Sequence, residues 1–104
     1  MKMITTTICF LLFIHRTVAS CDITDANFQD YVDEWITNST NHPCGEVIGD
    51  WDVSNVTDMS YVFCSTSGID ECNTARANFN EDLSGWNTSS VTSLEGTFRD
   101  ATSF

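Results

Sequence analysis

The sequence predicts an α+β repeat solenoid, with an N-terminal capping helix followed by about two short strand–turn–helix repeats. The first observation is a repeat: residues 51–63 and 86–98 carry Trp, Val, Met or Leu, and Phe at the same four offsets. The second observation is an amphipathic helical pattern just before the first repeat. Each unit of a solenoid buries its apolar side only against its neighbours, so internal repetition is typical of that architecture.

Residues 1–20 are predicted to be a secretory signal peptide. Lys2 precedes an apolar run that is too short to span a bilayer, and small residues stand before a cleavage site at the end of the segment. The same site also fits a bacterial lipobox, in which Cys21 would be lipidated. His15 and Arg16 lie between the run and this box, which is unusual for a lipoprotein. We therefore expect a protein that is secreted or lies at the extracellular cell surface, with lipidation of Cys21 as the alternative.

The chain that follows the signal segment is strongly acidic. Residues 21–104 hold 15 carboxylates against two basic side chains, Arg76 and Arg99, which gives a formal charge of −13. This charge repels nucleic acid and anionic lipid headgroups, so neither is expected as a direct partner. Insertion of the mature chain into a membrane is expected only if Cys21 is lipidated.

Four cysteines follow the signal segment: Cys21, Cys44, Cys64 and Cys72. In a short secreted chain they suggest two disulfides, for which three pairings are possible. Proximity in the sequence and the expected fold favour Cys21–Cys44 and Cys64–Cys72. Zinc is the competing interpretation, but the spacings of 23, 20 and 8 residues match no CxxC pair. No metal site and no cofactor are therefore predicted.

Three N-glycosylation sequons begin at Asn38, Asn55 and Asn87. In a eukaryotic secretory pathway each could carry a glycan, which requires a position at the surface. Asn55 and Asn87 belong to the repeat, so their sequons can also arise from its Ser/Thr-rich composition. Asn38 is the favoured site of the three.

Residues 21–44 are predicted to form a capping helix and a loop. Thr24 is the expected N-cap, and Asp25 would complement the helix dipole in the first turn. One apolar face follows helical spacing and is formed by Phe28, Tyr31, Val32, Trp35 and Ile36. The helix is expected to end near Thr37, and its apolar face is expected to cover the exposed end of the first repeat.

Residues 45–104 are predicted to form the repeats. Each unit is expected to hold a short strand and then a short helix or 3₁₀ turn, at 46–48 with 58–63 and at 78–83 with 93–101. The two units are 35 residues apart, but the first carries ten extra residues near 64–78, which gives an underlying period of 25. The chain is interpreted as the opening of a longer array. The apolar residues of its last unit are then expected to be partly exposed: Leu83, Val91, Leu94 and Phe98.

At these residues the chain resembles a known family. Residues 79–86 (FNEDLSGW) together with residues 51–63 (WDVSNVTDMSYVF) are similar to the repeat of BspA-like leucine-rich-repeat surface proteins. The resemblance covers residues 45–104. It implies a leucine-rich-repeat-like fold and an extracellular role in adhesion and in binding host or matrix proteins. The chain departs from the family's pattern at Asn87-Thr88, at Leu94 and in the insertion.

The expected function is a non-catalytic binding or adhesion role toward an unidentified extracellular protein or glycan. The expected surface is the face that carries Asn80, Glu81 and Asp82, together with the insertion. A polar ladder between neighbouring backbones is the structural alternative for Asn80 and Asp82. A secreted enzyme is a second hypothesis, because Asp50, Asp52 and Asp82 could form paired carboxylates, but no catalytic motif accompanies them. Calcium-dependent structure is a third hypothesis, but the acidic residues do not have the spacing of an EF-hand loop.

Overall fold

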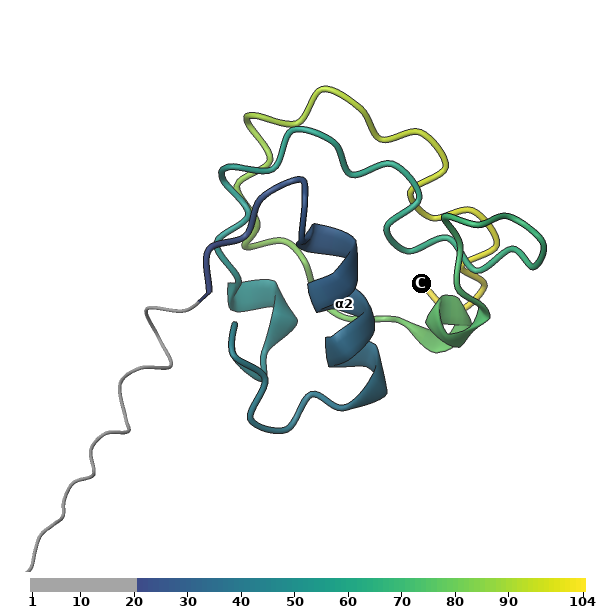
Figure 1. Ribbon diagram of the computed structural model, residues 1–104, viewed down its shortest axis with the longest axis horizontal. Coiled ribbons are helices and arrows are strands. Elements are labelled where there is room, and N and C mark those ends of the chain that lie inside the picture. The colour runs from purple at the N-terminus through teal and green to yellow at the C-terminus, as the bar shows by residue number, and fades with distance from the viewer. Residues whose placement is uncertain (1–20) are drawn as a thin grey trace, which may run out of the picture.

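The computed structural model describes residues 21–104, and the predicted signal peptide lies outside the described residues. The described chain contains one α-helix, α2 (Phe28–Thr37), and two short 3₁₀-helices, η1 (Ile48–Asp50) and η2 (Thr74–Asn78) (Figure 1). Turns and irregular segments connect them. Strand pairing within this range is limited to one isolated parallel bridge between Asp58 and Ser93.

The prediction of a strand–turn–helix repeat solenoid is wrong. Residues 46–48 and 78–83 do not form strands, because Ile48 opens η1 and the chain after η2 is irregular. Residues 58–63 and 93–101 form successive turns rather than short helices. The described chain is instead a small globule, in which α2 and the repeated segments pack around one core.

Short polar side chains explain why the repeated segments form turns. The side chains of Asp52, Asp58, Asp82 and Asn87 each accept a hydrogen bond from the backbone N–H two residues further on, at 2.9–3.1 Å. Such side chains give the backbone a partner within its own segment, and so compete with pairing in a sheet or a helix. The polar residues between the apolar positions therefore determine the local backbone conformation.

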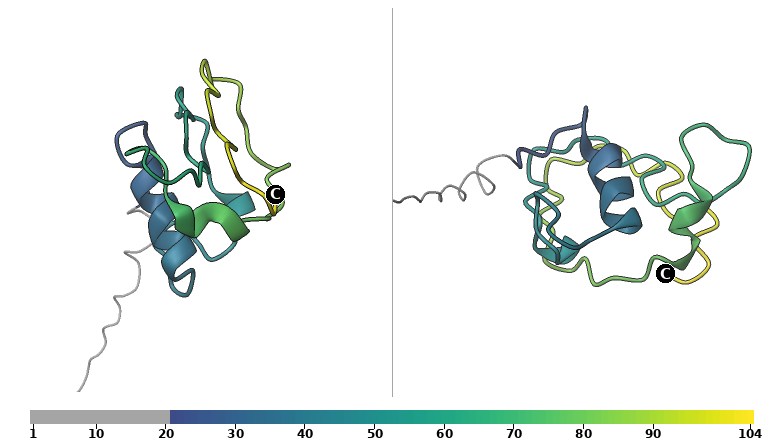
Figure 2. Two further views of the ribbon diagram at one scale, coloured as in Figure 1. Left: turned by 90° about the vertical axis from the view of Figure 1, so that its right-hand side faces the viewer. Right: turned by 60° about the horizontal axis from the view of Figure 1, so that its bottom comes forward.

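The two repeated segments nevertheless lie side by side, parallel and in register (Figure 2). We call residues 51–65 the first copy and residues 86–100 the second copy. Four N–H groups of the first copy donate to carbonyls of the second at 2.9–3.0 Å: Met59 to Ser93, Tyr61 to Glu95, Phe63 to Thr97 and Ser65 to Arg99. This register agrees with the 35-residue spacing of the repeat in the sequence.

The first copy directs every third residue into the core. Val53, Val56, Met59 and Val62 are at most 3% exposed. At the equivalent positions the second copy carries Thr88, Val91, Leu94 and Thr97, of which Thr97 alone is buried. The core therefore lies between α2 and the first copy. It comprises Ile23, Phe28, Val32, Ile48, Trp51, Val53, Val56, Met59, Val62, Phe63 and Phe79.

Four phenylalanine rings form a stacked block that links the two copies. Phe63 stacks on Phe98 of the second copy, with ring centroids 5.4 Å apart and ring planes inclined by 5°. Phe79 stacks on Phe63 at 4.2 Å, and Phe104 stacks on Phe98 at 4.3 Å. Phe63 and Phe79 are buried, whereas Phe98 and Phe104 are 41% and 50% exposed. The expected partial exposure of the second unit is thus confirmed at Phe98 and also at Leu94, which is 61% exposed.

Both disulfides form in the favoured pairing. Cys21 is bonded to Cys44 and Cys64 to Cys72, with Cα–Cα distances of 5.0 and 4.8 Å. The first disulfide fixes the segment before α2 to the loop after it, and the second closes the insertion. In the chain-entropy model, loops of 23 and 8 residues contribute about 3 and about 2–3 kcal/mol to stability. Because all four thiols are paired, none of these cysteines is free to bind zinc.

The helix α2 begins later than predicted. Its N-cap is Asn27 rather than Thr24. The carbonyl of Thr24 accepts the N–H of Phe28 at 3.0 Å, and the Thr24 N–H donates to the Asn27 side chain at 2.9 Å. The helix ends at Thr37, as expected. Asp25 therefore stands before the helix, and its carboxylate is directed to the first copy instead of the helix dipole.

Candidate functional site

A polar stripe on and before α2 faces the backbone of the first copy. Asp25, Gln29 and Asp33 are four residues apart, a spacing that places side chains on one side of a helix. The Asp25 carboxylate accepts hydrogen bonds from the Thr57 hydroxyl and from the N–H groups of Thr57 and Asp58, the last two at 2.8 and 3.2 Å. The Gln29 amide donates to the Ser60 carbonyl at 2.9 Å. These bonds satisfy backbone groups along the edge of the first copy that faces away from the second.

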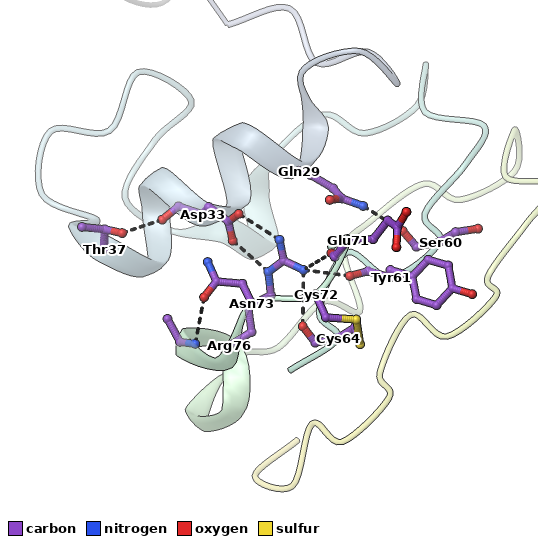
Figure 3. Close-up of polar contacts among 11 residues, drawn as sticks. Gln29, Asp33, Thr37, Ser60, Tyr61, Cys64, Glu71, Cys72, Asn73 and Arg76 are labelled. Carbon is purple, nitrogen blue, oxygen red and sulfur yellow. Dashed lines mark hydrogen bonds and ion pairs between the residues drawn. A yellow bond between two sulfur atoms is a disulfide. The ribbon is translucent and has the colours of Figure 1, made fainter. Parts of the chain in front are cut away.

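Arg76 joins the insertion to the same stripe (Figure 3). Its side chain is 2% exposed, and its Nε and Nη2 atoms each donate to the Asp33 carboxylate at 2.8 Å. Its Nη1 atom donates to three carbonyls, those of Tyr61, Glu71 and Cys64, at 2.8–3.3 Å. Bidentate, charge-assisted bonds of this kind are the strong class of hydrogen bond.

The sequence did not predict a structural role for Arg76. One feature of the sequence could have indicated this role. Residues 21–104 hold 15 carboxylates but only two basic side chains, and one of these two, Arg76, lies in the insertion. A single cation in that setting has many possible partners. Its actual partner, Asp33, lies 43 residues earlier, and no local pattern encodes such a distance.

A polar hollow of about 510 Å³ lies between α2 and the insertion. Its walls include four carboxylates, of which Asp33 is bonded to Arg76, and the others belong to Asp30, Asp70 and Glu71. Such walls can accept hydrogen bonds from a cationic group. The predicted surface residues Asn80, Glu81 and Asp82 are exposed but do not line this hollow. The structure therefore does not join the two parts of the predicted surface into one site.

Two of the three carboxylates considered for acid–base chemistry, those of Asp52 and Asp82, accept hydrogen bonds within turns. The Ser54 hydroxyl holds the pKa of Asp52 below its usual value, and the Ser84 backbone N–H does the same for the pKa of Asp82. The Ser60 hydroxyl likewise lowers the pKa of Asp58. These hydrogen bonds favour the ionised form, which is the acceptor that the turns need. These carboxylates therefore act as hydrogen-bond acceptors within their own turns.

A tyrosine and a glycine occupy equivalent positions in the two copies. Tyr61 and Gly96 both have positive φ angles, of 61° and 60°. The Tyr61 ring lies against Gly96, where an added Cβ would overlap the ring carbons. The Tyr61 hydroxyl donates to Glu95 at 3.0 Å, and this hydrogen bond raises the pKa of Tyr61. Glycine at this position of the second copy therefore makes room for the tyrosine of the first.

The three sequon asparagines, Asn38, Asn55 and Asn87, are all exposed. The Asn38 side chain accepts the Thr40 N–H at 3.0 Å, and the Asn87 side chain accepts the Ser89 N–H at 3.1 Å. All three positions are accessible for modification.

These features define a small acidic protein that is held by two disulfides and built around two in-register copies of one segment. The chain belongs to the family described as "Mycoplasma protein of unknown function, DUF285", whose model matches residues 33–104. The match begins within α2 and includes the insertion and both copies. No curated protein and no solved structure matches the chain. Within residues 21–104, no helix has the length and apolar character needed to cross a membrane.

Proposed function

We propose that the protein is secreted or displayed at the cell surface, where it binds an extracellular protein or glycan without catalysis. The observation that carries the proposal is the apolar surface of the second copy, where Leu94, Phe98 and Phe104 are 61%, 41% and 50% exposed. Large exposed apolar groups on a soluble protein commonly mark an interaction site. The sequence resemblance to BspA-like surface proteins supports the same role.

The disulfides support the extracellular part of the proposal. Disulfides persist in oxidising compartments, and small exported domains use them to compensate for a limited core. The Cys21 sulfur is bonded to Cys44. A lipid thioether would need that same sulfur, so the disulfide favours free secretion over the lipoprotein alternative.

The enzyme alternative has less support. Asp52 and Asp82 are each engaged by the serine two residues further on. Their carboxylates therefore have a structural role in the turns. Glycosylation is a further part of the proposal, with Asn38 as the favoured site, because this sequon lies outside the repeat and its asparagine is exposed.

The test is to express the full chain in a secreting host and to measure the intact mass of the product. The expected product begins at Cys21, lacks four hydrogens relative to the reduced chain and appears in the medium. It should then bind at least one member of a panel of purified matrix proteins and glycans, and the reduced and alkylated protein should lose that binding. Retention in the cell with free thiols, a diacylglyceryl mass on Cys21, or no binding across the panel would overturn the corresponding part of the proposal.

A further inference from the structure

The second copy presents a row of backbone donors that have no partner within residues 21–104. In the first copy, the N–H groups of Met59, Tyr61, Phe63 and Ser65 bind carbonyls of the second copy. The equivalent groups, 35 residues on, belong to Leu94, Gly96, Phe98 and Asp100, and none of them donates a hydrogen bond in the described chain. Because the copies are parallel and in register, these groups point away from the first copy. They repeat at every second residue, like the four donors of the first copy that bind the second.

Apolar side chains accompany this row. Leu94 and Phe98 belong to the row itself, and Phe104 stacks on Phe98 with the ring planes inclined by 12°. Figure 2 (left) shows the second copy and the C-terminal residues on the far side of the first copy from α2. We call the backbone of residues 94–100 together with Phe104 the open edge.

The surroundings of the open edge are acidic. Glu95 and Asp100 lie within it, and Arg99 is its one cation. The two carboxylates accept hydrogen bonds from the Tyr61 and Thr66 hydroxyls of the first copy and its continuation. Residues 21–104 as a whole carry a formal charge of −13. Charge complementarity therefore favours a basic partner.

A second molecule of this protein is a poor occupant for the open edge. Stacking head to tail would need the outer edge of its first copy, where Asp25, Gln29 and Arg76 already bind Thr57, Ser60 and Cys64. Pairing two open edges would leave both rows without acceptors, because the carbonyls of Leu94, Gly96 and Phe98 already accept the N–H groups of Thr97, Arg99 and Ala101. The partner must instead offer backbone carbonyls at alternate residues, as an extended peptide does.

We propose that the open edge binds an extended, basic peptide segment of an extracellular protein. The carbonyls of the peptide accept hydrogen bonds from the N–H groups of Leu94, Gly96, Phe98 and Asp100. Its apolar side chains cover the Phe98 and Phe104 rings, and its basic side chains pair with the carboxylates. This inference rests on the proposed binding function and names its surface and its class of partner.

The test uses the full, disulfide-bonded protein and a synthetic peptide in which lysine alternates with phenylalanine. Titration followed by amide NMR should shift the Leu94, Gly96, Phe98 and Asp100 signals and slow their hydrogen exchange. A peptide with glutamate in place of lysine should bind much more weakly. The variant L94K should weaken binding about tenfold or more, because it removes an apolar contact and adds a repelling charge.

The matched control is V47K, because Val47 is also 61% exposed but precedes the first copy. Equal effects of L94K and V47K, or shifts confined to other residues, would overturn the inference. Concentration-dependent dimerisation that L94K abolishes would also overturn it, in favour of self-association. If the protein binds a member of the matrix and glycan panel and L94K leaves that binding unchanged, the proposed function stands and the open edge is not its site.

Discussion

Replacing Asp33 by asparagine should destabilise the protein through Arg76. The substitution keeps the size of the side chain but removes the charge that two guanidinium bonds of 2.8 Å require. Removing one partner of a fully buried ion pair costs about 3–5 kcal/mol. Arg76 is buried, but the Asp33 side chain is 33% exposed and water can partly replace it. We therefore expect a loss of about 2–3 kcal/mol in the free energy of unfolding.

That loss is large against the total stability, which is about 4–13 kcal/mol for a chain of 84 ordered residues. The assay is urea unfolding of the disulfide-bonded protein, followed by tryptophan fluorescence. The control is D30N on the same helix, because Asp30 is exposed and makes no hydrogen bond to Arg76. It should change the stability by less than about 0.5 kcal/mol. If D33N and D30N were equally stable, the ion pair would contribute nothing and the reasoning would be wrong.

Three other perturbations test the scaffold. The Thr57 hydroxyl lowers the pKa of Asp25 from its ordinary value of 3.8. The stability that this hydrogen bond contributes is therefore present above pH 3.8 and is lost as the pH falls through the lowered pKa. The variant D25N should flatten the acid unfolding curve in this range, and an unchanged curve would contradict the assignment. G96A should lower the free energy of unfolding in urea more than G68A, because both glycines have positive φ but only Gly96 lies against the Tyr61 ring. Equal losses of stability would exclude the steric explanation. Replacing Cys64 and Cys72 together by alanine should lower the stability by about 2–3 kcal/mol, and a much smaller loss would mean that Arg76 alone holds the insertion.

The sequence predicted the features that depend on local or repeated patterns. The apolar residues Phe28 and Val32 have helical spacing, and both are buried on α2. The equal offsets of the two copies indicated their register, which the bonds from Met59 to Ser65 confirm. The pairing of the cysteines followed their separation along the chain.

The strands could not be excluded from apolar periodicity alone. Phe79 and Leu83 share one parity and both point toward the core, but the side chain of Asp82 binds the Ser84 N–H and bends the chain between the two repeat units. In this chain the Asp-x-Ser pattern determines the backbone conformation more strongly than the apolar positions on either side of it. The ion pair of Asp33 with Arg76 was beyond reach for another reason, because only the folded chain brings these residues together.

The bonds that hold the two copies and α2 together join residues that are far apart in the chain. The two copies are bonded across 34 residues, and Gln29 of α2 and Asp25 before it are bonded to the first copy across 31–33 residues. The chain must therefore close long loops before it gains these contacts, and α2, with ten residues, is too short to be stable alone. Folding dominated by non-local contacts typically takes milliseconds to seconds. The eight-residue loop between Cys64 and Cys72 closes far faster than these long loops, so the two cysteines can meet before the insertion docks on α2.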